Sequence, residues 1–150
     1  MMTIGVEAAR VLSDDELRRV GLSAIKDIPD AFIYADRSET IRFWNAGSTR
    51  IFGYAADDAV GRSLDIIIPE RLRGRHWVGF DEMMETEEPH HPPDGLRAVP
   101  ALTRSGKAIS IEFTVAPVRD GQGMVESMAA ILRDVVERFE ELKRLRKAAR

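Results

Sequence analysis

Hydrophobic residues fall into short runs that alternate with polar turns along most of the chain. Ala31 to Ala35 is a short apolar and aromatic run, and Thr40 to Trp44 alternates between apolar and polar residues. These two segments predict a β-hairpin. Ile109 to Val118 also alternates, and it lies between strand-like stretches at residues 96–103 and 124–133. The pattern therefore predicts five strands.

Helical periodicity is present in three other segments. Ser13 and Glu16 have the spacing of a capping box, so they predict a helix that Gly21 is expected to interrupt. Residues 69–86 carry apolar positions at i, i+4, i+8 and i+11 on one helical face, namely Leu72, His76, Phe80 and Met83. A last helix is expected from Asp134, with coiled-coil-like spacing.

This order of elements predicts an α+β fold. The two hairpin groups are expected to join into a five-stranded antiparallel sheet with short helices on one face. Helices should flank the sheet at both ends of the chain. We expect an N-terminal helical extension over residues 1–21, the central domain over residues 22–134 and a C-terminal signalling or coiled-coil helix over residues 135–150.

Composition narrows the functional classes. The 150 residues carry 22 basic and 25 acidic side chains, a net charge of −3, which argues against a dedicated nucleic-acid-binding protein. The absence of cysteine excludes disulfides, thiolate metal sites and cysteine nucleophiles. No apolar stretch approaches the ~20 residues of a membrane span. We therefore expect a cytoplasmic protein without a membrane segment.

Catalytic motifs are absent from the sequence. It has three histidines, no Ser/His/Asp grouping, no HExxH motif and no nucleotide-binding glycine motif. We therefore expect that the protein is not an enzyme.

The segment IPDAFIYADRSETIRFWNAGSTRIFGYAADDAVGRSLDIIIPE resembles the first half of a PAS sensor domain. The marks that carry the resemblance are Trp44-Asn45, Phe52-Gly53-Tyr54, Gly61 and Ile68-Pro69-Glu70. The end, LRDVVERFEELKRLRK, is similar to the last strand of the family and its step into a signalling helix. The resemblance covers roughly residues 22–135. It implies the PAS fold and a stand-alone sensory or signalling module.

A second resemblance concerns the central helix. The stretch PERLRGRHWVGFDEMMETEEPH is similar to the haem-binding helix of rhizobial oxygen-sensing PAS kinases. This implies haem b with His76 as the iron ligand, and a sensor of a diatomic gas or of redox state. It also implies that His90 lies near a propionate and that Arg97 donates a hydrogen bond to bound oxygen. Apolar residues of the implied pocket are Phe80, Met83, Phe113 and Val115.

Two other interpretations of the same residues stay open. Glu82 stands where the haem-binding subfamily has an arginine, and a carboxylate repels a propionate. In a ligand-free interaction or dimerisation module, His76 would instead be a hydrogen-bonded core residue. Trp44 could stack on FAD in a flavin-binding redox sensor, although a core aromatic position is the simpler interpretation.

The terminal helices carry apolar residues that the central domain does not need. We expect Leu17, Phe139 and Leu142 to pair between two copies in a homodimer. A downstream signalling protein is a further expected partner, and neither nucleic acid nor a membrane is expected.

Overall fold

Five strands form one antiparallel sheet in the order β2-β1-β5-β4-β3. The computed structural model describes residues 10–86 and 98–149, with the side chains of residues 136–140 left aside. The strands are β1 (Ala31–Ala35), β2 (Ile41–Trp44), β3 (Val99–Leu102), β4 (Ala108–Arg119) and β5 (Val125–Asp134). The expected five-stranded antiparallel sheet is therefore confirmed.

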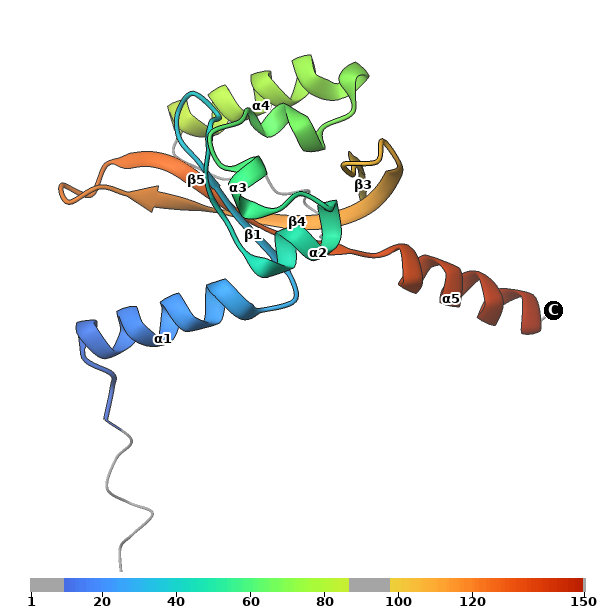
Figure 1. Ribbon diagram of the computed structural model, residues 1–150, viewed down its shortest axis with the longest axis horizontal. Coiled ribbons are helices and arrows are strands. Elements are labelled where there is room, and N and C mark those ends of the chain that lie inside the picture. The colour runs from blue at the N-terminus through green and yellow to red at the C-terminus, as the bar shows by residue number, and fades with distance from the viewer. Residues whose placement is uncertain (1–9, 87–97, 150) are drawn as a thin grey trace, which may run out of the picture.

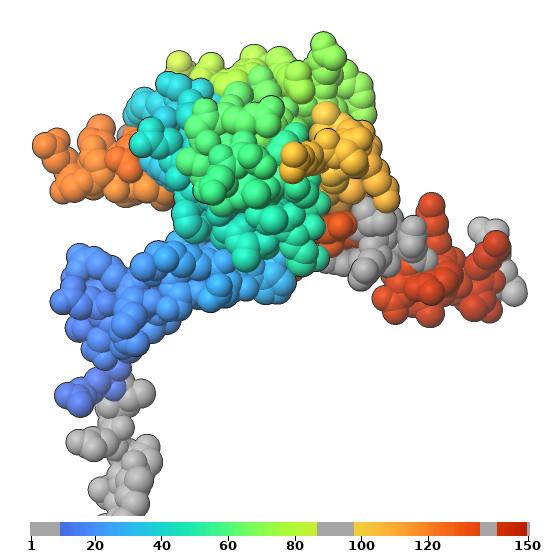
Figure 2. All heavy atoms as spheres, viewed as in Figure 1, coloured from blue at the N-terminus to red at the C-terminus, as the bar shows by residue number. Residues whose placement is uncertain are grey.

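Short helices cover one face of this sheet (Figure 1). They are α2 (Ala46–Phe52), α3 (Ala56–Ala59), the 3-10 turns η1 (Leu64–Ile67) and η2 (Glu70–Leu72), and α4 (Arg73–Thr86). Two further helices, α1 (Asp14–Asp27) and α5 (Val136–Ala148), project away from the sheet, and the last turn of α1 contacts the body near α2 (Figures 1 and 2). Within the described ranges, no helix has the length and apolarity needed to cross a membrane.

The core lies between the sheet and the short helices. Ile33 of β1 pairs with Trp44 of β2 on one side and with Ala130 of β5 on the other. Because side chains alternate along a strand, Ile33 and Trp44 share the helix-covered face with Leu132, two residues beyond Ala130. All three are buried with Phe52 of α2 in the main hydrophobic cluster.

Helix α1 begins as its sequence predicts. Ser13 and Glu16 form both hydrogen bonds of a capping box, each at 3.1 Å. The expected interruption at Gly21 is wrong, because the helix continues without a break to Asp27. A single glycine in an exposed helix weakens it without ending it. No residue of α1 is buried.

Asn45 holds the start of α2 against the chain that precedes β1. Its Oδ1 accepts from the backbone N–H of Ser48, as an N-cap does, and from that of Phe32. Its Nδ2 donates to the carbonyls of Ile25 and Asp30. Trp44 and Asn45 thus close the junction between the hairpin and α2.

Candidate functional site

Helix α4 carries the histidine on which the ligand expectation depends. Pro69 precedes the 3-10 turn η2, and α4 follows directly at Arg73. The Arg73 side chain donates to the carbonyl of Ile68 at 3.0 Å and so ties the start of α4 to the preceding loop. His76 is in the first turn of this helix, with its side chain 32% exposed.

His76 faces a buried carboxyl group. Its Nδ1 lies 3.2 Å from Oε1 of Glu39, whose side chain is 0% exposed. Neither Nδ1 nor either Glu39 oxygen forms a hydrogen bond with another described residue. The Oδ1 atom of Asp65 in η1 is also buried without a hydrogen-bond partner in the described chain. His76 and Glu39 therefore lie side by side in the interior, and Asp65 is near enough to influence the charge state of both.

The electrostatics of this group follow from its burial. Burial, and then the nearby charges of Asp65 and Asp81, raise the pKa of Glu39 to about 8. Burial lowers the pKa of His76, and the charge of Asp65 opposes that change in part. Both side chains are therefore mainly neutral at pH 7, so their contact at 3.2 Å is not an ion pair.

Sequence reasoning missed Glu39, which it placed in an ordinary turn. The backbone of Glu39 is left-handed, with φ 58°. A non-glycine residue in this region is uncommon, and nothing in the hydrophobic pattern marks it. The available signal was a glutamate in a turn position where glycine would be preferred, two residues before the start of β2.

Phe80 and Met83 pack together as their helical spacing predicts. Phe80 is buried against Val125 and Met128 of β5, and Met83 packs onto the same cluster. This cluster is separate from the main core. It fixes the second half of α4 over the beginning of β5.

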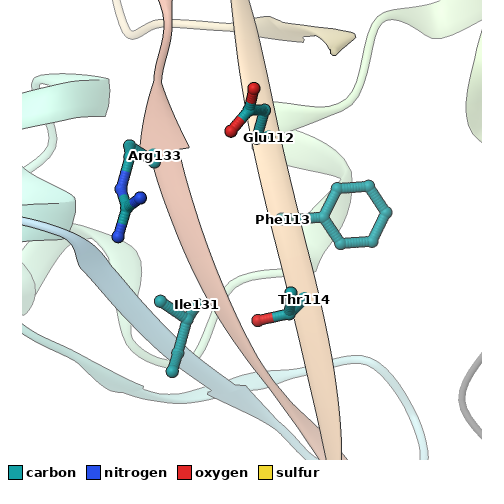
Figure 3. Close-up of a pocket in the computed structure, with 5 residues that line it drawn as sticks. All are labelled: Glu112, Phe113, Thr114, Ile131 and Arg133. Atoms are coloured by element: carbon teal, nitrogen blue, oxygen red, sulfur yellow. The ribbon is translucent and has the colours of Figure 1, made fainter. Parts of the chain in front are cut away.

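Phe113 and Val115 lie on the same face of the sheet as that cluster. Phe113 pairs with Leu132 and Val115 pairs with Ala130, next to the pair of Pro117 and Met128. Figure 3 shows the Phe113 ring pointing away from the side chains of Thr114 and Ile131, although all three residues line the same small pocket. Phe113 is 37% exposed although it faces the helix side. Part of the apolar surface at Phe113 is therefore exposed.

Other expected site residues fall outside the site or outside the described ranges. His90 and Arg97 belong to residues 87–97, which the structure does not describe. Trp44 is buried, and its Nε1 donates to the Tyr54 carbonyl at 3.0 Å and to Thr49 Oγ1 at 3.2 Å. Trp44 is therefore a core residue. In the described part of the chain, no three histidine or carboxylate side chains gather closely enough to hold a metal ion.

Comparison with known protein families covers most of the chain. The model of the family described as the PAS fold matches residues 25–140. The chain belongs to the PAS fold family. The match includes the sheet and all the short helices, and it also takes in the first residues of α5. The protein is therefore a PAS sensory domain, as the sequence resemblance implied.

A curated relative of this PAS domain is the sensor protein FixL of Bradyrhizobium diazoefficiens. It is 28% identical over 116 residues, which are 77% of this chain and 22% of the relative. An uncharacterised protein of Azorhizobium caulinodans is 32% identical over 121 residues, 80% of this chain and 16% of the relative. The chain spans about a fifth of the length of these relatives.

Solved structures agree on the fold. The PAS domain of a protein from Colwellia psychrerythraea has a TM-score of 0.71 and 18% identity, and covers 81% of this chain and 98% of its own. An RNA-binding Light-Oxygen-Voltage receptor has a TM-score of 0.69 and 22% identity, and covers 94% of this chain and 39% of its own. At these identities the likeness establishes the fold alone.

Proposed function

We propose that this PAS domain binds haem b through His76 and senses a diatomic gas or a redox state. The observation that carries the proposal is the position of His76, whose Nδ1 faces the buried Glu39 carboxyl at 3.2 Å. Histidines that ligate metals almost always donate their other ring N–H to a carboxylate or carbonyl oxygen. The other ring nitrogen of His76, Nε2, would then be the iron ligand.

The donor set fits haem better than a bare metal ion. A porphyrin supplies four nitrogen ligands of its own, so a single protein histidine is sufficient. The partly exposed ring of Phe113 and the neighbouring Val115 offer an apolar surface on the side of the sheet that α4 covers. Haem would supply the iron that binds the gas or changes oxidation state.

The other residues have distinct parts in this proposal. Phe80 and Met83 pack α4 against β5 and so fix the position of the helix that carries His76. The sequence resemblance supports two further proposals. His90 would lie near a haem propionate, and Arg97 would donate a hydrogen bond to the bound gas. Strand β5 is paired with both β1 and β4 and leads into α5, which connects the sheet to the end of the described chain. We expect no catalytic turnover from such a sensory domain.

Absorption spectroscopy after titration with haemin tests the proposal. We expect a Soret band of bound haem in the wild type and its loss in His76→Ala. Val78→Ala is the matched control, because Val78 lies on the same helix with a largely exposed side chain. A wild type that takes up no haemin, or a His76→Ala variant that binds it unchanged, would overturn the proposal.

A ligand-free interaction module is the second candidate. The specific observation in its favour is the same contact, because a neutral histidine next to a protonated carboxyl requires no iron to balance its charge. A flavin sensor has less support, since the Trp44 ring is enclosed by Phe52 and Tyr54 and its N–H is used within the core. Flavin uptake during the same titration series would show as its blue absorption bands.

The terminal helices are proposed to form a homodimer. Leu17 is largely exposed and no residue of α1 is buried, so part of the apolar surface of this helix is left uncovered by the described chain. Leu142 and Leu145 of α5 are exposed as well. The side chain of Phe139, the third expected contact, lies outside the described residues. A downstream signalling protein and a cytoplasmic location also remain proposals.

A further inference from the structure

Glu39 has an unusual environment for an acidic residue. Its side chain is fully buried, and neither carboxyl oxygen forms a hydrogen bond with a described residue. Buried polar groups nearly always have such a partner, and an exception calls for an explanation. The polar atom that faces this carboxyl is Nδ1 of His76, at 3.2 Å from Oε1.

The backbone holds Glu39 in this position. Its N–H donates to the carbonyl of Asp36 at 2.8 Å, and its own carbonyl accepts from the N–H of Leu64 at 2.9 Å. The Asp36 side chain accepts from the N–H groups of Ser38 and Thr40 and so closes the turn. The left-handed φ of 58° is strained for a glutamate. Strain of this kind persists where surrounding contacts over-determine it, and it is concentrated at functional sites.

We propose that Glu39 is the positioning residue of His76: its Oε1 accepts a hydrogen bond from Nδ1–H and leaves the lone pair of Nε2 for the iron. This inference rests on the proposed haem function and adds a residue to it. A carboxyl group can accept at Oε1 whether or not Oε2 is protonated, so the contact does not require an ionised glutamate. This hydrogen bond would fix the tautomer and the ring orientation.

The neighbouring acidic residues cannot take the role of Glu39 as the acceptor for Nδ1 of His76. Asp65 and Asp81 add negative charge to its surroundings, but among the described carboxylates only Glu39 is within ion-pairing distance of His76. This difference provides a matched pair of variants. Asp65→Asn removes a nearby charge, whereas Glu39→Gly removes the acceptor itself.

Three substitutions separate positioning from folding. Glu39→Gly suits the left-handed backbone, so the variant is expected to fold while it lacks the acceptor. Glu39→Gln keeps a carbonyl oxygen at the same place and is the conservative rescue. Asp65→Asn is the control for the local charge.

The first measurement uses the protein without haem. Nitrogen-15 NMR of the imidazole distinguishes a proton on Nδ1 from a proton on Nε2. We expect the Nδ1–H tautomer of His76 in the wild type and in Glu39→Gln, and its loss in Glu39→Gly. A wild type with its proton on Nε2, or a Glu39→Gly variant with an unchanged tautomer, overturns the inference.

The second measurement uses haemin as the probe. We expect the dissociation constant to rise about 10- to 100-fold in Glu39→Gly, as for other partners of ligating histidines, with recovery in Glu39→Gln and little change in Asp65→Asn. The iron–histidine stretching frequency should fall in Glu39→Gly alone. If Glu39→Gly matches the wild type while His76→Ala loses haem, this inference fails and the proposed function stands. If the wild type takes up no haemin, both fail.

Discussion

Asn45 donates a hydrogen bond from Nδ2 to the backbone carbonyl of Ile25 at 2.7 Å, across twenty residues of sequence. The same side chain accepts from Ser48 and Phe32. One buried amide therefore fastens the last turn of α1, the first residues of β1 and the start of α2. The resemblance to the PAS family marked Asn45, and its bonds show why an amide with two donors and an acceptor is needed there.

Replacing Asn45 should therefore destabilise the whole domain. Asn45→Ala removes the cap of α2 and leaves several buried backbone groups without partners, so we expect a loss of about 2 to 4 kcal/mol in the free energy of unfolding. Ser13→Ala is the matched control, because Ser13 caps an exposed helix, and it should cost about 0.5 to 1 kcal/mol. Urea denaturation followed by circular dichroism measures both, and equal losses would contradict the role of Asn45.

Gly47 is required for the close approach of α2 to the residue before β1. A Cβ at Gly47 would lie 2.0 Å from the carbonyl oxygen of Asp30 and 2.5 Å from its carbon. Because both are backbone atoms, Gly47→Ala should destabilise the domain by about 3 kcal/mol. At Gly79 of α4 nothing lies within 4 Å of the added atom, so Gly79→Ala should stabilise by up to about 1 kcal/mol. Thermal unfolding of both variants gives the comparison.

Glu39 makes the stability of the ligand-free protein depend on pH. Its pKa is about 8 in the folded state and about 4.3 in an unfolded chain, so the folded state binds more protons between these values. The free energy of unfolding should therefore fall as pH rises from 5 to 8, by up to about 1.4 kcal/mol per pH unit.

Glu39→Gln removes this titration and provides the reference. Denaturation of the two proteins at a series of pH values should show the wild type losing stability relative to the variant above pH 5. The difference should level off above the folded pKa of about 8. Parallel curves over the whole range would show that Glu39 is not a buried, protonated acid.

Disrupting the terminal helices tests the proposed homodimer. Leu17→Glu and Leu142→Glu place a charge on exposed apolar positions of α1 and α5 and should shift the protein toward monomer. Val78→Glu introduces the same charge at an exposed position of α4 and should leave the mass unchanged. Sedimentation velocity at micromolar concentrations measures this, and a monomeric wild type would contradict the proposal.

The fold was more predictable from the sequence than the site. Strand β1 was expected and found at Ala31 to Ala35, because its apolar run is short and bounded by Pro29-Asp30 and Asp36. The alternation of Ile109 to Val118 likewise predicted β4, which is one residue longer at each end. Both predictions rest on the hydrophobic pattern within a single segment, which does not depend on residues distant in the sequence.

The contact between His76 and Glu39 could not be predicted in this way. The periodicity of α4 placed His76 on the inward face, but it gave no information about which side chain would meet it. That partner lies in a turn 37 residues earlier, and the two side chains come together only in the folded chain. Long-range polar contacts of this kind depend on the assembled fold rather than on any sequence period.

Val135 lies directly between β5 and α5, which begins at the next residue. Its side chain is buried, and its N–H donates to the carbonyl of Ser110 at 3.1 Å. No flexible linker separates β5 from α5, so the helix leaves the sheet with a set rotational phase. Each residue inserted after Val135 would turn the helix by about 100°, whereas seven would return it to within about 20° of its starting direction. A partner that contacts one side of α5 would therefore respond to the rotation of this helix relative to the sheet. The number of residues at the junction would determine which side of α5 faces that partner.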